Sequence, residues 1–371
     1  MLKKGKTMPF VKTSDLRVGM MVSEDVYSKA GQLIVHKDSL LSRQMISHIK
    51  FYSIEQVNIY DGEMAMEIRE AYVNRNGAQT TQLERILKSE EYKVFKKEYT
   101  ANVNMLQDSV NDIILRNTPV DAPALIEDTV KIFDKNQGYF SFFGMLHSMK
   151  QIDDSTFAHS VNVAMIARLI GTWSNFDPET LDLLTLAGLL HDVGKCQIPD
   201  EILMKPRRLT DQEYNFVKMH AQFGYEILKH QDLDIRVKHA ALHHHERCDG
   251  TGYPFGHDIT TLGDFECIIS IADVYDAMTA DRCYRTGLCP FEVISFFEEE
   301  GLQKYHPKYI TPFLQRIANT YLNSDVLLSN GDTGRIIFIN ERLTRPIIQL
   351  HKDNSFLNLL QSPAIYIQAI I

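Results

Sequence analysis

The chain has 371 residues, of which 44% are hydrophobic and 23% are charged, and its formal net charge is -9. This length allows two or three domains, and the composition is that of a soluble globular protein. The acidic balance argues against broad binding to nucleic acid polymers or to anionic membranes. A small anionic substrate held by a few local cations or metal ions stays compatible with it.

No targeting or membrane segment is apparent, and the cysteines indicate a reducing compartment. Lys3, Lys4 and Lys6 are not followed by an apolar run of signal-peptide length, and no run of about 18 apolar residues occurs anywhere. The cysteines are odd in number and form no CxxC pair: Cys196, Cys248, Cys267, Cys283 and Cys289. We therefore expect free thiols in a cytoplasmic protein, without a disulfide framework or a zinc knuckle.

Residues 1–62 predict a small α+β N-terminal module. Strand-like runs at 20–22, 32–35 and 56–60 are separated by turn residues, and Ser42 could cap a short helix through Phe51. The module shows no catalytic constellation.

Residues 63–154 predict a helical linker or packing region. Its apolar residues recur at steps of three and four: Tyr92, Phe95, Tyr99, Val103, Leu106, Val110 and Ile113. We favour packing of this stripe within the chain, because the repeat is too short for a coiled coil; a homodimer through the 92–113 helix stays open. Pro119 should end the helix, and another should begin near Ala122.

Residues 155–322 again predict helices, and residues 323–371 predict strands. Asp177 followed by Pro178 is a typical helix start. Thr210 and Glu213 form a capping-box pattern, so a helix should run from there past His220. In the last segment the turn at Asn330-Gly331 predicts a hairpin between 326–329 and 335–339.

Ten of the fourteen histidines lie between His147 and His257, and several interrupt apolar helix patterns. His191-Asp192 ends the apolar run 186–190, and Asp273 interrupts the run 268–272. A capping aspartate beside a core histidine would explain His191-Asp192 alone. The adjacent histidines at 244–245 favour metal binding over a structural role, because neighbouring histidines seldom both have structural roles. Imidazoles and a carboxylate on buried helices are the ligands that a dinuclear hydrolytic site needs.

The order of these residues closely resembles the HD-GYP subfamily of HD-domain phosphohydrolases. The resemblance is carried by His159, the string HDVGK at 191–195, His220, the string HHERCDGTGYP at 244–254, and Asp273. It covers residues 155–312, and its two strings are highly specific together. It implies a mainly α fold, with an all-helical HD-type catalytic domain at 155–322 between the helical region and the strand-rich extension.

The resemblance also implies the ligands of two divalent metal ions, with iron or manganese favoured and zinc compatible with the ligand chemistry. One ion would be held by His159, His191, Asp192 and Asp273. The other would be held by Asp192 as a bridge together with His220, His244 and His245. Ser155 stands where some members have a third-metal glutamate, so we expect two ions rather than three.

Other positions receive roles from the same resemblance. Asp192 and Lys195 would be catalytic, with Lys195 neutralising charge on a phosphate oxygen. Arg282 and Arg285 would clamp phosphate, and Gly252 and Tyr253 would form the pocket rim.

Two further histidines lie next to the motif. We expect His239 and His243 to be solvated or to support the ligands rather than to be ligands.

The implied function is hydrolysis of cyclic di-GMP to linear pGpG, with GMP as an optional further product, through in-line attack by a hydroxide that bridges the metals. Base preference is not fixed by the motifs, so 3′3′-cyclic GMP-AMP is an alternative substrate. A nucleotidase is a more distant alternative that the GYP string disfavours. A catalytically silent sensor of cyclic dinucleotides is the alternative from a different class, although all core ligands and Lys195 are present.

Overall fold

The computed structural model describes residues 88–371 with breaks at 136–138, 150–154, 204, 206–208 and 280–287. Ahead of them it describes residues 10–60 with breaks at 18–19, 21, 28–32, 36–40, 42–45, 47–48, 51 and 53. The chain divides into two compact units: Met1–Thr81 with Ser329–Gly331, and Gln82–Leu328 with Asp332–Ile371. The finer boundaries predicted from the sequence, at residues 63, 155 and 323, stay predictions.

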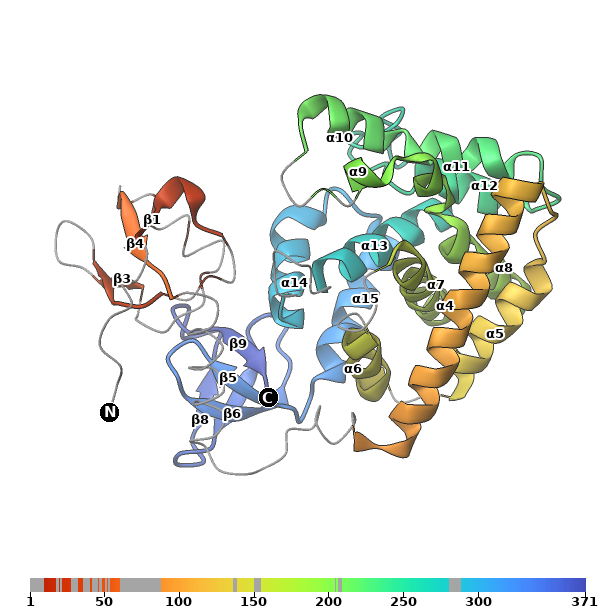
Figure 1. Ribbon diagram of the computed structural model, residues 1–371. Coiled ribbons are helices and arrows are strands. Elements are labelled where there is room, and N and C mark those ends of the chain that lie inside the picture. Colours follow the sequence, from red (N-terminus) through yellow and green to blue (C-terminus); the bar gives the residue numbers. More distant parts are fainter. Residues whose placement is uncertain are drawn as a thin grey trace. The chain divides into compact units, whose positions relative to one another are not determined.

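The first unit contains two small antiparallel pairs of strands, drawn in red in Figure 1. The strands are β1 (Phe10–Lys12) paired with β4 (Gln56–Asn58), and β2 (Val26–Tyr27) paired with β3 (Leu33–Val35). A single-turn 3-10 helix, η1 (Thr13–Asp15), follows β1. Buried aliphatic residues such as Val22, Val35 and Ile49 form its core. Both ends of the predicted 42–51 helix lie outside the described residues, although Ile49 and Lys50 are helical.

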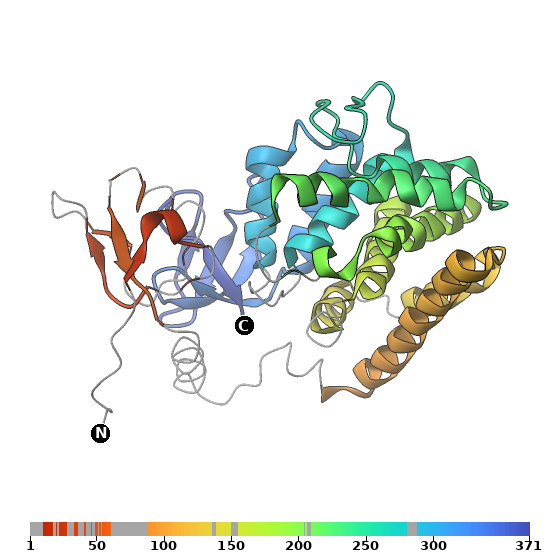
Figure 2. The same cartoon turned by 45° about the horizontal axis from the view of Figure 1, so that its top comes forward.

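The second unit is mainly helical (Figures 1 and 2). Its first helices are α4 (Glu90–Arg116), α5 (Ala122–Lys135), α6 (Tyr139–Met149), α7 (Thr156–Trp173) and α8 (Pro178–Leu190). The following elements are the 3-10 helix η2 (Val193–Gln197), α9 (Asp200–Leu203), α10 (Asp211–Lys218), α11 (His220–Leu228) and α12 (Ile235–His243). The last are α13 (Asp264–Thr279), α14 (Pro290–Phe296), the π-helix η3 (Phe297–Gly301) and α15 (Pro307–Thr320).

Two of these helices, α8 and α10, begin at the capping residues that the sequence predicts. The Asp177 side chain accepts a hydrogen bond from the N–H of Thr180, with Pro178 in the first turn, as predicted. Thr210 and Glu213 form the predicted capping box. The helix that follows does not run past His220 as predicted, because it ends at Lys218 and α11 begins at His220.

The core of the second unit is built around α7. This helix is buried almost along its whole length and packs against α8, α13 and α4. The hydroxyl of Tyr99 on α4 donates to Asn162 Oδ1 on α7 at 2.8 Å, a buried polar contact that fixes how the two helices meet.

The apolar stripe of α4 is covered by the chain itself. Its members, from Tyr92 to Ile113, are buried, and α4 packs against α5, α6 and α7 (Figure 2). This is the packing that the sequence favoured over a dimer seam. The homodimer through the 92–113 helix stays a prediction.

The C-terminal region is larger than the predicted hairpin. Its five antiparallel strands are ordered β8-β7-β6-β5-β9. They are β5 (Asp325–Leu328), β6 (Thr333–Phe338), β7 (Ile347–Leu350), β8 (Phe356–Asn358) and β9 (Ile367–Ile370). The predicted hairpin corresponds to β5 and β6, and the sheet's buried residues Val326, Ile336 and Ile348 join the core of the helices.

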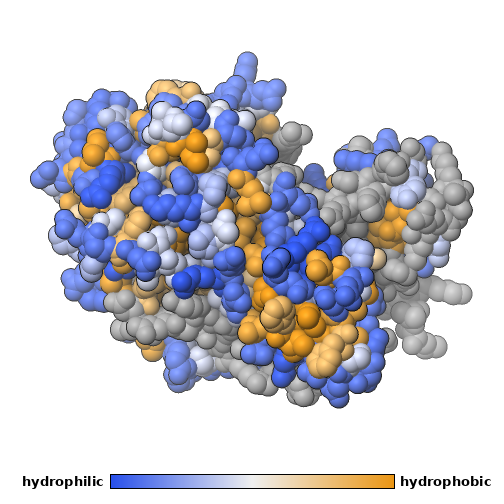
Figure 3. Space-filling view, turned by 180° about the vertical axis from the view of Figure 1, so that it is seen from behind, coloured by the Kyte–Doolittle hydropathy of each residue, from blue (hydrophilic) through white to orange (hydrophobic). Residues whose placement is uncertain are grey.

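Apolar side chains also reach the surface of this unit, where they gather in the orange areas of Figure 3. On the C-terminal sheet, Phe338 is 55% exposed and Phe356 is 68% exposed. None of the helices in the described part of the chain combines the length and hydropathy needed to cross a bilayer.

Candidate metal centre

All seven residues predicted as metal ligands lie together in the second unit. They come from α7, the ends of α8 and α12, the start of α11, and the middle of α13, and they are His159, His191, Asp192, His220, His244, His245 and Asp273. The donor atoms form two groups, each with its atoms within 4.8 Å of one another. One group contains His159, His191 and Asp273, and the other contains Asp192, His220, His244 and His245.

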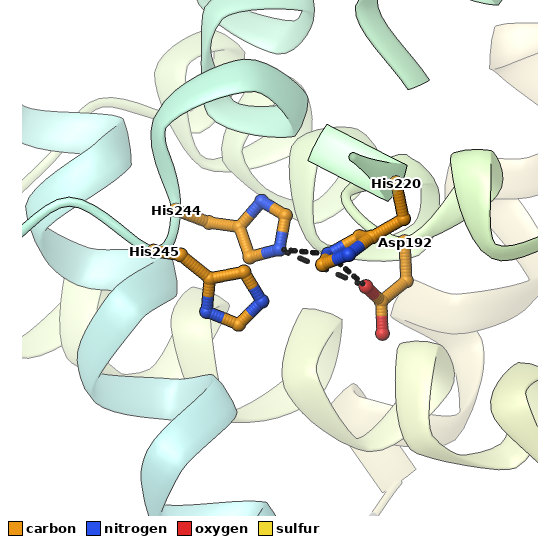
Figure 4. Close-up of side chains that lie close together, drawn as sticks. All are labelled: Asp192, His220, His244 and His245. Carbon is orange, nitrogen blue, oxygen red and sulfur yellow. Dashed lines mark hydrogen bonds and ion pairs between the residues drawn. The ribbon is translucent and has the colours of Figure 1, made fainter. Parts of the chain in front are cut away.

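The carboxylate of Asp192 faces both groups, one oxygen to each. Oδ2 lies 3.6 Å from His159 Nε2 and 3.3 Å from His191 Nε2. Oδ1 lies 3.3 Å from His220 Nε2 and 3.7 Å from His244 Nε2, as Figure 4 shows for the second group. Because the two oxygens of a carboxylate can bind separate cations, this geometry is suited to a bridge between two ions.

The tautomers of three buried histidines are set by the backbone. Nδ1 of His191, of His220 and of His244 each lies near the carbonyl oxygen three residues earlier, at 2.7, 2.7 and 3.0 Å. An N–H at Nδ1 therefore donates to the backbone, and Nε2 is left as the lone-pair nitrogen. All three Nε2 atoms face Asp192, so the rings present metal-binding nitrogens to one point.

His159 is oriented by two carboxylates of α13. Its Nε2 lies 3.1 Å from Asp273 Oδ1, and its Nδ1 lies 2.8 Å from Asp276 Oδ2. Asp276 is the site residue that sequence reasoning left unassigned. Its spacing of one helical turn from Asp273 was the available indication.

Charge and burial divide the ionisable groups into anions and neutral donors. Burial alone would raise the pKa of Asp192, but the charge of Lys195 beside it outweighs burial and holds that pKa well below its usual range. Burial lowers the pKa values of His244 and His245 well below the ordinary value, with further lowering from neighbouring histidines. Neutral imidazoles beside an ionised carboxylate are the protonation states that metal binding requires.

His159 differs from these histidines. Burial lowers the pKa of its imidazole, but the hydrogen bonds to Asp273 and Asp276 outweigh burial and raise the pKa to about 9. A proton on this ring takes the position that a cation between the carboxylates would otherwise occupy.

Two buried polar atoms fit a divalent cation. His191 Nε2 and Asp192 Oδ1 have no hydrogen-bond partner within the described ranges of the chain. Their residues are 0% and 1% exposed. A buried polar atom without a partner is costly, and a cation bound at each of the two groups would satisfy the atom that faces it. The mixed imidazole and carboxylate donor set suits iron, manganese or zinc.

Lys195 lies on η2 and contacts the same aspartate. Its Nζ forms an ion pair with Asp192 Oδ2. The preceding Gly194 packs so closely on α11 that a Cβ there would lie 2.0 Å from the carbonyl oxygen of His220. This close approach brings the HDVGK segment against the helix that carries His220.

The GYP loop lies over one of the candidate ligands. The ring of Tyr253 stacks on His245, with centroids 4.6 Å apart and 28° between the planes. Gly252 packs on the backbone of Glu246, where a Cβ would lie 2.4 Å from the Glu246 Cα. The structure places Gly252 as a packing position that seats the loop. Arg282 and Arg285 lie outside the described residues.

Ser155, His239 and His243 lie near the motif residues in the sequence but are not among the donors around Asp192. The Ser155 side chain caps α7 by accepting the N–H of Ala158 at 3.1 Å. His239 and His243 face each other, with ring centroids 5.7 Å apart, and neither belongs to the two groups around Asp192.

Part of the chain is similar to known proteins. Residues 141–309 match the family model of the HD domain. A cyclic di-GMP phosphodiesterase of Pseudomonas aeruginosa is 35% identical over 194 residues, which cover 51% of this chain and 46% of that protein. A 3′3′-cGAMP-specific phosphodiesterase of Vibrio cholerae is 33% identical over 172 residues, which cover 45% of this chain and 40% of that protein. The chain spans about half the length of the curated relatives it matches.

A solved structure, described as Bd1817, a HDG"Y"P protein from Bdellovibrio bacteriovorus, is also similar. It has a TM-score of 0.45 and 17% identity, and the match covers 84% of this chain and 99% of that one. Residues 141–309 match the HD domain family, and both the HDVGK and the HHERCDGTGYP strings lie within them.

Proposed function

We propose that this protein is a metal-dependent phosphodiesterase that opens cyclic di-GMP to linear pGpG. The observation that carries the proposal is the division of the Asp192 carboxylate between two groups of donors, because phosphodiester hydrolysis is the chemistry typical of paired metal ions. The relatives from Pseudomonas aeruginosa and Thermotoga maritima, at 35% and 31% identity, support the choice of substrate.

The proposed ligands follow the two groups. His159, His191, Asp192 and Asp273 would hold one ion, and Asp192, His220, His244 and His245 would hold the other. When bound, two divalent ions would lower the pKa of water and stabilise negative charge on a phosphate. We propose iron or manganese for both, on the donor set and the family resemblance. A third ion at this centre is not proposed, because Ser155 supplies no carboxylate and caps α7.

The chain's own residues would bind and orient the substrate around this centre. Asp192 would hold both halves of the centre at a fixed separation, which orients the scissile phosphodiester for in-line attack. Lys195, beside Asp192, would stabilise charge that grows on a phosphate oxygen. The ring of Tyr253 would lie at the rim of the substrate pocket. Arg282 and Arg285 would form ion pairs with phosphate oxygens of the substrate.

A second candidate substrate is 3′3′-cyclic GMP-AMP. The relatives include a protein specific for this dinucleotide at 33% identity, which is close to the identity of the cyclic di-GMP enzymes. The two substrates differ in one base, so the same metal and phosphate contacts would serve both. We favour cyclic di-GMP because it is the substrate named for the relatives at 35, 32 and 31% identity.

The test is product analysis on the full chain purified without oxygen and loaded separately with Fe²⁺ and Mn²⁺. Each loaded sample receives cyclic di-GMP or 3′3′-cyclic GMP-AMP at the same concentration, and Asp192→Ala protein is the control. We expect pGpG from the wild type, slower cleavage of cyclic GMP-AMP, and no product from the control. Preferential cleavage of cyclic GMP-AMP would overturn the substrate and keep the reaction class. Tight binding of both without cleavage would instead support a silent sensor.

A further inference from the structure

A third cluster of metal-ligand side chains shares no residue with the candidate metal centre. It contains His243, the last residue of α12, together with Glu246 and His257. One donor atom from each of these side chains lies within 4.8 Å of the others. Glu246 is buried and the two histidines are half-buried, so the cluster lies at the surface edge of the fold where an ion from solvent can enter.

The carboxylate of Glu246 is fixed in place but not neutralised. The side chain is 1% exposed. Oε1 accepts the N–H of Phe255 at 2.8 Å, and Oε2 accepts the N–H of His257 at 3.0 Å. Across the described ranges, no lysine or arginine forms an ion pair with it. A carboxylate has about four lone-pair positions, so two amides leave room for a cation, and burial without one is unfavourable.

His243 supplies the second indication of a ligand. Its Nδ1 is buried and has no hydrogen-bond partner in the part of the chain that the structure describes. The His243 ring lies 5.0 Å from the His257 ring, centroid to centroid, with 37° between the planes. Among the described residues, His243 therefore combines a buried nitrogen that has no partner with membership of a cluster that contains a buried carboxylate and a second imidazole, which fits an unfilled metal site.

Aromatic packing explains only part of this arrangement. Phe255 stacks on His257 with centroids 5.4 Å apart, and it also lies 5.7 Å from His243. Those contacts explain why the rings gather. They leave the buried Nδ1 of His243 without a partner and the Glu246 carboxylate without a countercharge, and a divalent cation would satisfy both.

We propose that His243, Glu246 and His257 bind a divalent transition-metal ion of the Zn²⁺ class, with water completing the coordination. Two imidazoles and one carboxylate form a ligand set that suits Zn²⁺. Ligands at about 2.0–2.1 Å from a tetrahedral ion lie about 3.3 Å apart, so small side-chain rotations close the cluster. The ion joins the end of α12 to the loop after Tyr253, the ring that stacks on His245. The bound ion therefore braces the loop over the candidate metal centre.

The first experiment counts ions in the full chain. Wild type, His243→Gln and His257→Gln are each equilibrated with Co²⁺ or Zn²⁺, desalted, and assayed for metal per chain by mass spectrometry. His230→Gln, an exposed histidine after α11, is the matched control. We expect each cluster variant to lose one equivalent and the control to lose none. Equal metal content in all four proteins overturns the proposal.

The second experiment needs no substitution in the cluster. Asp192→Ala protein is treated with a histidine-modifying reagent with and without Zn²⁺, and each histidine is read by peptide mass spectrometry. We expect Zn²⁺ to protect His243 and His257 but not His230. Equal modification with and without Zn²⁺ overturns the proposal, whatever the outcome for phosphodiesterase activity.

Discussion

His159 on α7 and Asp276 on α13 form a hydrogen bond of 2.8 Å between Nδ1 and Oδ2. The same imidazole presents Nε2 to Asp273, which lies one helical turn before Asp276. A carboxylate behind a metal-binding histidine orients the ring and strengthens its basicity. Asp276 is therefore a positioning residue for the proposed centre, and it acts through His159.

Asp276→Asn tests this role. The amide can still accept the hydrogen bond from Nδ1 but carries no charge, so we expect divalent metal affinity to fall by about 10- to 100-fold. Metal titration of the metal-free protein measures the change. Asp353→Asn is the control, because that exposed side chain accepts hydrogen bonds from Ser355 and belongs to none of the metal-ligand groups of the described residues. Wild-type affinity in the Asp276 variant would remove the positioning role.

Metal binding should release a proton from His159. In the metal-free protein the pKa of His159 is raised from 6.5 to about 9, so this ring is charged at neutral pH. We expect proton release on Mn²⁺ binding at pH 7 to fall at pH 9.5, because the ring is already neutral there. Calorimetry in buffers of different ionisation enthalpy measures it. Equal release at both pH values would contradict the prediction.

The raised pKa of His159 also affects the folding stability of the metal-free protein. A raised pKa means that the folded state binds the His159 proton more tightly than the unfolded state does. Its stabilising contribution is complete below pH 6.5 and is lost as the pH rises through about 9. Denaturant unfolding of metal-free wild type and His159→Gln across this range should show the two stabilities converging toward high pH. A constant difference would show that the proton is not the cause.

Substitution of Lys195 tests whether this side chain stabilises the charge that grows on a phosphate oxygen. Lys195→Ala should keep both proposed metal ions and reduce turnover by about 2–4 kcal/mol, roughly 30- to 1000-fold. Metal content by mass spectrometry and kcat on cyclic di-GMP separate the two effects. Lys195→Arg, which keeps the charge beside Asp192, should recover part of the rate. Unchanged turnover in the alanine variant would exclude this role.

Tyr253 should act through its ring. Because it stacks on His245, Tyr253→Phe should retain metal affinity and kinetics close to wild type. Tyr253→Ala should lose about 0.5–1.5 kcal/mol of ring contact, which we expect mainly as a higher KM. Steady-state kinetics of the two variants compares them. Equal losses in both variants would point to the hydroxyl instead.

The sequence predicted what depends on local spacing. The caps at Asp177 and Thr210, the apolar stripe of α4 and the β5–β6 turn each lie within a few residues of the signals that indicate them. The HDVGK and HHERCDGTGYP strings identified the family because several chemically demanding residues occur at fixed spacings.

What the sequence did not predict depends on contacts between distant segments. Asp276 became part of the site because α13 packs on α7, 117 residues earlier in the chain. The C-terminal sheet was underestimated because β9 pairs with β5 although three other strands, β6 to β8, lie between them in the sequence. The break between α10 and α11 was not predicted because Met219, which separates the two helices, is not a residue type that is typical of turns.

The most direct test of the Asp192-bridged centre is the rate of pGpG formation as metal is added to metal-free protein without oxygen. Mn²⁺ or Fe²⁺ is titrated from zero to three equivalents per chain, with Asp192→Ala in parallel. We predict a rate that rises to a plateau near two equivalents in the wild type and no product from Asp192→Ala. Full activity in the variant, or none in wild type that holds two ions per chain, would contradict the account.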